Sequence, residues 1–134
     1  AGLGLAISKS YDNIELDIKY IKNLEKIFIE NLQTYNIEHV LHIEDRLPGV
    51  LTIGFPGIDG ESLLIALDLK GIAVSFGSAC SSGTTKASQI LLDSGIDENL
   101  AKSTLRISFG KIHTYEEVSY VAKQLSSIIT RLEK

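Results

Sequence analysis

Leu105-Arg106-Ile107-Ser108-Phe109 alternates apolar and polar side chains with a period of two residues. Successive side chains of a β-strand point to opposite faces of its sheet. The stretch therefore predicts a strand whose apolar residues are buried and whose other face carries Arg106 and Ser108. A sheet with one packed face and one polar face is the expected centre of the fold.

Two amphipathic helices are expected to cover the apolar face of this sheet. Residues 114–132 start with Thr114 and Glu117, which are spaced as in a capping box. Residues 12–35 show apolar side chains three and four positions apart, the spacing of one helix face. The two apolar stripes consist of Val118, Val121, Leu125, Ile128, Ile129 and Leu132, and of Ile14, Ile18, Ile21, Leu24, Phe28 and Leu32.

The other segments of the chain predict the remaining strands and helices. Strands are expected over residues 37–43, 50–55 and 72–75, and helices over residues 59–69, 88–92 and 98–103, with glycine, proline and aspartate turns between them. The order α-β-β-α-β-loop-α-β-α predicts a single α+β domain over residues 1–134, in which helices pack on a small mixed or antiparallel sheet.

The composition of the 134 residues narrows the classes of function. A formal net charge of -4 and a pI near 5.3 argue against a nucleic-acid-binding surface, which is usually basic. No apolar run approaches the ~20 residues of a membrane helix. A single cysteine cannot form an internal disulfide, and a free thiol fits a reducing compartment such as the cytoplasm.

Cys80 lies in the run of small residues Gly77-Ser78-Ala79-Cys80-Ser81-Ser82-Gly83. A lone cysteine is often a buried small hydrophobe without chemical function. A loop with so little side-chain bulk instead favours an exposed, reactive thiol. Both interpretations remain open on the residues alone.

The three histidines give a weaker signal. His39 and His42 would lie on opposite faces of their expected strand, which is poor geometry for one metal ion. We therefore expect solvated or hydrogen-bonded histidines there, and a local turn contact for His113. The sequence predicts no metal site.

Several ordered motifs make the chain resemble the C-terminal part of the cysteine desulfurases, pyridoxal-phosphate enzymes of the class-V aminotransferase group. The motifs are residues 74–83 around Cys80, residues 105–111 around Arg106, and residues 114–117. The resemblance extends upstream through Leu47-Pro48-Gly49 and Gly60-Glu61-Ser62-Leu63. The serine-rich run resembles the branch of the family in which the cysteine lies on a longer, mobile loop.

The resemblance implies the small C-terminal domain of a fold-type I pyridoxal-phosphate enzyme and assigns roles to two residues. In this family free L-cysteine forms an adduct with the cofactor, and the thiolate corresponding to Cys80 attacks its sulfur to form a persulfide while L-alanine leaves. Arg106 matches the arginine that binds the substrate carboxylate; an ordinary surface ion pair is the alternative. The resemblance further implies a homodimer that passes sulfur to an iron-sulfur scaffold or a sulfur-carrier protein.

The parts of such an enzyme that hold the cofactor are not recognisable in the sequence. There is no histidine-lysine pair of the family's kind and no glycine-rich phosphate loop. We therefore expect the cofactor-binding domain to lie outside this chain and the chain alone to be inactive. Two alternatives remain: an α+β regulatory or scaffold module with an incidental or redox-sensitive thiol, and the small domain of a class-V enzyme that acts on another substrate.

Three departures from the family pattern concern the surroundings of these residues. Phe76 replaces the usual serine before Gly77, Lys86-Ala87 replaces an acidic residue and proline, and Lys111 replaces an arginine. An aromatic ring at position 76 could anchor the base of the cysteine loop and shorten its reach.

Overall fold

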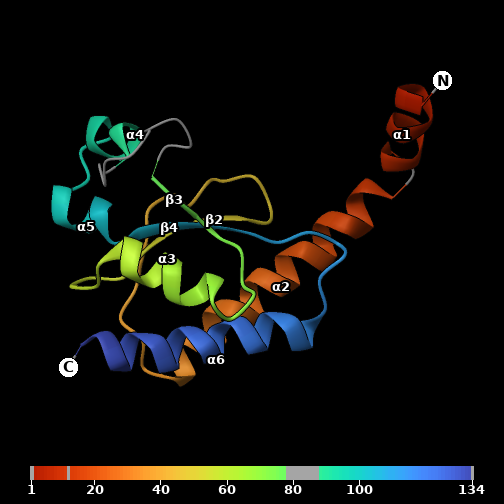
Figure 1. Cartoon of the computed structure of the whole chain (residues 1–134). Helices are drawn as coiled ribbons and strands as arrows, with labels where there is room; N and C mark the ends of the chain where they lie inside the picture. Colours follow the sequence, from red (N-terminus) through yellow and green to blue (C-terminus); the bar gives the residue numbers. More distant parts are fainter. Residues whose placement is uncertain (1, 12, 78–87, 134) are drawn as a thin grey trace.

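A four-stranded antiparallel sheet, packed on one face by helices, forms the centre of the computed structural model (Figure 1). The structure describes residues 2–11, 13–77 and 88–133. Its elements are α1 (Gly2–Tyr11), α2 (Ile14–Thr34), β1 (Val40–Leu41), β2 (Val50–Gly54), α3 (Gly60–Asp68), β3 (Ser75–Phe76), α4 (Gln89–Asp93), α5 (Glu98–Lys102), β4 (Thr104–Ser108) and α6 (Tyr115–Leu132). The α+β prediction is confirmed.

The strands are arranged in the order β1-β2-β4-β3, and each neighbouring pair is antiparallel. β2 and β4 form the longest ladder, which runs from the pair Val50 and Ser108 to the pair Gly54 and Thr104. Leu105 and Ile107 are buried in this ladder, whereas Arg106 is exposed. The alternation along β4 thus divides the sheet into a packed face and a polar face, as predicted.

The core lies between the sheet and the helices α2, α3 and α6. Both predicted amphipathic helices are present, and Phe28 of α2 and Leu125 of α6 are completely buried. The predicted capping box is also present: the Thr114 hydroxyl accepts from the Glu117 amide at 3.2 Å, and the Glu117 carboxylate accepts from the Thr114 amide at 2.8 Å. These caps fix where α6 begins.

Two expectations about local structure are wrong, and one helix was not predicted. The strand expected over residues 37–43 is only β1, because Asn36 has a positive φ of 55° and Ile37 donates its amide to the Leu32 carbonyl, which makes it part of the helix ending. The strand expected over residues 72–75 is displaced to β3. The helix α1 was not predicted, because Gly2 and Gly4 are poor helix formers and its apolar side chains face solvent.

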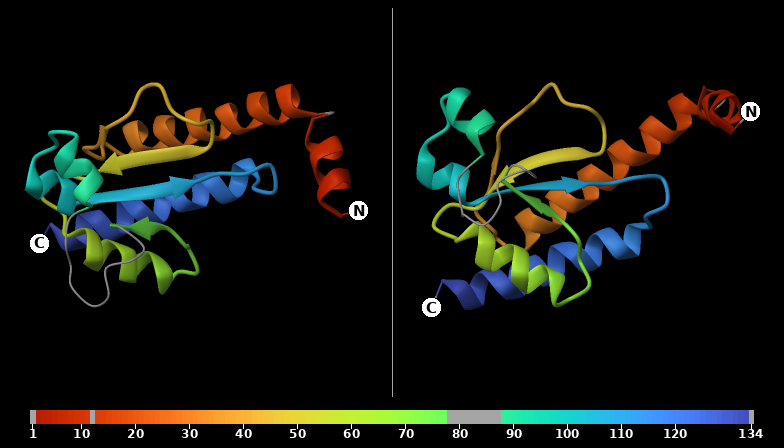
Figure 2. Two further views of the ribbon diagram at one scale, coloured as in Figure 1. Left: turned by 90° about the horizontal axis from the view of Figure 1, so that it is seen from above. Right: turned by 45° about the horizontal axis from the view of Figure 1, so that its top comes forward.

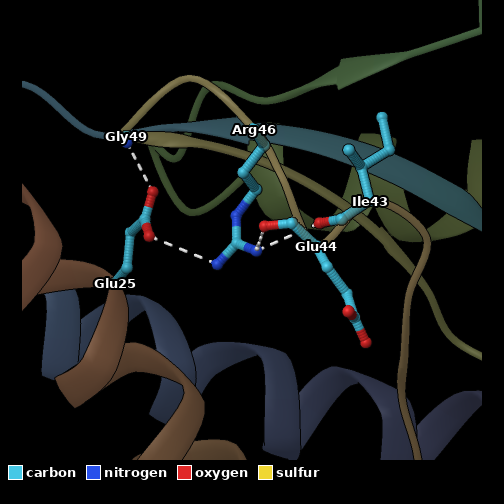
Figure 3. Close-up of polar contacts among 5 residues, drawn as sticks. All are labelled: Glu25, Ile43, Glu44, Arg46 and Gly49. Atoms are coloured by element: carbon cyan, nitrogen blue, oxygen red, sulfur yellow. Dashed lines mark hydrogen bonds and ion pairs between the residues drawn. The ribbon is translucent and has the colours of Figure 1, made fainter.

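A buried carboxylate connects α2 to the start of β2 (Figure 3). Glu25 accepts a hydrogen bond from the Gly49 amide and forms an ion pair with Arg46 at 3.3 Å. The Arg46 guanidinium also donates to the Ile43 carbonyl at 3.0 Å. The loop between β1 and β2 is therefore held against α2 at several points.

Gly49, which is held by Glu25, also contacts the chain at the end of β4. Its φ is +91°, and a Cβ atom at this position would lie 2.5 Å from the Phe109 carbonyl oxygen. Only glycine tolerates both conditions easily. The Gly49 carbonyl accepts from the Phe109 amide at 2.7 Å, so the two strands are joined directly beyond the end of their ladder.

The variant Glu25→Gln should lower the free energy of unfolding by about 2–4 kcal/mol, because it leaves the largely buried Arg46 guanidinium without a counterion. Glu30→Gln on the same helix is the matched control: Glu30 pairs with Lys26 at 3.7 Å on the exposed surface, where a lost pair costs less than about 1 kcal/mol. Urea denaturation of both variants measures the difference. Equal stabilities would contradict the structural role of Glu25.

Candidate functional site

Arg106 lies on the exposed face of β4, between strands that each place a hydroxyl beside it. The register pairs Arg106 with Thr52 of β2 on one side and with Ser75 of β3 on the other. The Arg106 guanidinium donates to the Ser75 hydroxyl at 3.2 Å. The predicted position of Arg106 on the polar face is confirmed. None of the ion pairs found among the described residues involves Arg106, so the ion-pair alternative gains no support there.

A small cavity of about 150 Å³ lies beside Arg106. Its polar wall includes Thr52 and Ser75, and its apolar wall includes Leu91 of α4. Gly77 and Ser88 also line it. These are the described residues immediately before and after residues 78–87, so the chain segment that contains Cys80 begins and ends at the cavity of Arg106.

Cys80 itself lies outside the described residues, as do Lys86 and Ala87. The predicted role of Cys80 therefore stays a prediction. Sequence reasoning did not find Ser75, Thr52 or Ser88 as neighbours of Arg106. Only the pairing register of three strands brings these residues together, and no local pattern in the sequence carries that information.

Phe76 is packed inward at the base of this segment. Its side chain contacts the core, and a Cβ atom at Gly60 would collide with its ring and lie 2.5 Å from the Lys102 carbonyl oxygen. Gly60, the first residue of α3, thus provides the space that the ring occupies. The suggested anchoring by Phe76 agrees with this contact, whereas its effect on the reach of Cys80 concerns residues that the structure does not describe.

His42 lies at the end of a short chain of hydrogen bonds on the polar side of the sheet. The Thr104 hydroxyl donates to the Leu100 carbonyl at 2.7 Å, so its oxygen accepts from His42 Nε2 at 2.8 Å. This arrangement requires the proton on Nε2. Burial lowers the pKa of His42 from its ordinary value, because the charged imidazolium is poorly solvated there.

The other two histidines have local partners. His39 Nδ1 lies 2.7 Å from the Ile37 carbonyl oxygen, and His113 Nδ1 accepts from the Gly110 amide at 2.9 Å. The prediction of a turn contact for His113 is confirmed. In the part of the chain that the structure describes, no three histidine, cysteine, aspartate or glutamate side chains are grouped as metal ligands would be.

The helices of the described residues also bear on membrane insertion. Across residues 2–11, 13–77 and 88–133, no helix combines the length and the apolar character that crossing a bilayer requires.

Comparison with known proteins gives a consistent result. The family model described as Aminotransferase class-V matches residues 1–121. The chain is 35% identical over 133 residues to "Cysteine desulfurase IscS" of Rickettsia bellii (98% of this chain, 32% of the relative). It is 36% identical over 136 residues to the protein of that name from Neisseria meningitidis serogroup A (99% and 33%).

A solved structure shows the same arrangement. The NifS-like protein from Rickettsia africae matches with a TM-score of 0.80 and 31% identity over 96% of this chain and 33% of its own. A second, titled "NIFS-LIKE PROTEIN", matches with a TM-score of 0.75 and 27% identity, over 92% of this chain and 30% of its own. The chain thus spans about a third of the length of these proteins.

The buried position of His42 predicts a measurable pH dependence of stability. Because its pKa is lower in the folded state, the unfolded chain takes up a proton first as the pH falls below about 6.5. His42 should therefore contribute stability above that pH and lose it as the pH falls through the pKa of the folded state. Urea denaturation between pH 7.5 and 5 should show a smaller loss of stability in His42→Gln than in the wild-type chain.

His39→Gln is the comparison variant, since it removes a histidine three positions away that takes no part in the hydrogen bonds of Thr104. A pH dependence that flattens in His39→Gln rather than in His42→Gln would contradict the assignment.

Proposed function

Because the chain belongs to the class-V aminotransferase family, we propose that residues 1–134 form the C-terminal domain of a cysteine desulfurase. The complete enzyme converts L-cysteine to L-alanine and holds the sulfur as a persulfide on Cys80. The observation that carries the proposal is the cavity beside Arg106, which Gly77 and Ser88 line from the two ends of the segment that contains Cys80.

Arg106 is proposed to bind the carboxylate of the substrate. A guanidinium can hold a carboxylate through two parallel hydrogen bonds and so fix the orientation of the amino acid. Ser75 accepts one hydrogen bond from Arg106 Nη2 and thereby helps to position the guanidinium at the cavity. The exposed position of Arg106 leaves its remaining donors accessible to a ligand.

Cys80 is proposed to accept the sulfur of the bound cysteine. It follows Gly77 by three residues, a span of at most about 11 Å even for a fully extended chain. The chain length alone thus keeps the thiol within reach of the cavity beside Arg106. The sulfur atom passes to the Cys80 thiolate, and alanine leaves once the carbon that carried the sulfur has taken up a proton.

Pyridoxal phosphate, which supplies the electron sink in this family, is held through a Schiff base to a lysine. None of the residues lining the cavity beside Arg106 is a lysine. Lys26, Lys102 and Lys111 instead form ion pairs with Glu30, Glu98 and Asp17. We therefore assign the cofactor to the part of the enzyme outside this chain.

The remaining steps follow from the chemistry of a persulfide. The outer sulfur atom of the Cys80 persulfide must be passed to an acceptor. The partners proposed are therefore a scaffold for iron-sulfur clusters or a sulfur-carrier protein. The thiol must stay reduced between turnovers, which fits a cytoplasmic location. The complete enzyme is proposed to be a homodimer, as its family resemblance implies.

Cys80→Ser in the full-length enzyme should abolish the release of sulfide from cysteine, because serine cannot accept the sulfur. Alkylation followed by mass spectrometry should find one additional sulfur atom on the peptide that contains Cys80 in the wild-type enzyme only. The 134-residue chain mixed with cysteine and pyridoxal phosphate is the control and should release no sulfide. Undiminished activity of Cys80→Ser, or sulfide from the chain alone, would refute the assignment.

Arg106→Lys in the full-length enzyme should reduce kcat/KM for cysteine about 10- to 100-fold, mainly through a higher KM, because lysine keeps the charge but loses the paired donors. Arg131→Lys, on the exposed end of α6, provides the matched control. Steady-state kinetics over a range of cysteine concentrations give the two constants. A KM that is unchanged in both Arg106→Lys and Arg106→Ala would remove Arg106 from the substrate site.

A further inference from the structure

β3 and β4 separate soon after they pair. Their ladder consists of Ser75 with Arg106 and Phe76 with Leu105. Continuing it by one hydrogen-bonded step would join Ala73 to Ser108, yet no backbone hydrogen bond between these two residues occurs in the structure. Figure 2 shows the chain that leads into β3 diverging from β4. A wedge therefore opens between β4 and the segment 71–74.

The backbone groups that face this wedge can be identified from the register. The Phe109 amide donates to Gly49 on the β2 side, and backbone groups of an antiparallel strand alternate between its two edges. Ser108 therefore directs its N–H and C=O toward the wedge. Within the described ranges, no backbone group is bonded to the Ser108 or Ala73 amide on this side. The edge of β4 at Ser108 and the segment 71–74 thus face each other without pairing.

A cavity of about 530 Å³ fills the wedge. One wall is the segment 71–74, the second is residues 107–109 of β4 and its extension, and the floor is the first half of α6. The apolar part of the lining includes Ile72, Val74, Ile107, Phe109, Val118 and Val121, and His113, Glu117 and Tyr120 line the cavity as well. The space therefore combines an apolar floor with free backbone donors and acceptors on both sides.

We propose that this wedge receives an extended strand from the part of the longer class-V polypeptide that lies outside residues 1–134. A strand in this position would bond to Ser108 on one side and to Ala73 on the other, as in β-augmentation. Every second side chain would rest on the apolar floor near Val118. The other side chains would emerge beside Ser108, on the face that carries Arg106, and would border the proposed substrate site.

The length of the relatives favours this occupant. The chain covers 32% and 33% of the two curated relatives, so about two thirds of each lies outside the match. A position beside the edge of β4, above the side chains of α6, is an interior position that suits a permanent part of the fold.

Backbone amide exchange measured by NMR tests the proposal. The 134-residue chain is compared with the same chain joined to the first two thirds of the Rickettsia bellii relative, or mixed with that fragment if the fusion does not fold. The amides of Ala73 and Ser108 should exchange on the order of 100-fold more slowly once the wedge is filled. The Leu105 amide, which faces β2 in both states, is the internal control.

Ser108→Pro and Ser108→Ala provide a matched pair of variants. Proline removes an amide that has no backbone partner in the isolated chain, but it also fixes φ at about −65° and restricts the residue before it, so the stability difference between the two variants in the isolated chain is the reference. In the longer polypeptide the stability difference between Ser108→Pro and Ser108→Ala should be larger than this reference. Protection of Ser108 in the isolated chain at all concentrations, or no protection in the longer polypeptide, would overturn the proposal. Protection that rises with the concentration of the isolated chain would identify a second copy as the occupant instead.

Discussion

The hydrogen bond between the Glu25 carboxylate and the Gly49 amide fixes the position from which the rest of the sheet is built. Gly49 is bonded in turn to Phe109, and from that point the register of β2 with β4 is set residue by residue. Arg106 lies opposite Thr52 only in this register. A shift of one residue would turn Arg106 into the core and Ile107 out to solvent. A buried carboxylate on α2 therefore determines where the candidate site lies without touching it.

The same alternation serves both stability and chemistry. Leu105 and Ile107 join the core beneath the sheet, while the residues between them remain available on the polar face. Because one strand supplies both sets, the guanidinium of Arg106 rests on a rigid support. Ser75 limits its orientation further. A group that must orient a small charged substrate benefits from such fixed placement, since each additional rotamer of the binding group weakens the discrimination.

The sequence predicted those features that a local pattern determines. The helices α2 and α6, the capping box at Thr114 and the exposed side of Arg106 all follow from periodicity within one segment. The short strands β1 and β3 were misplaced, because their bounds depend on partners far away in the chain. Ser75 and Ser88 could not be connected with Arg106 for the same reason. Cys80 was singled out by its small neighbours and a family motif, which are again local signals.

The open wedge and the lining of the cavity beside Arg106 both bear on how the proposed enzyme is divided. Arg106, the proposed carboxylate-binding residue, and Gly77 and Ser88, which flank the segment of Cys80, line one cavity, yet none of the residues lining that cavity is a lysine. The edge of β4 that adjoins Arg106 is also incomplete at Ser108. A site completed there by the rest of the polypeptide would join substrate orientation, cofactor chemistry and sulfur transfer only after the two parts have assembled. Such coupling would keep the thiol of Cys80 from meeting activated substrate in an incompletely folded enzyme.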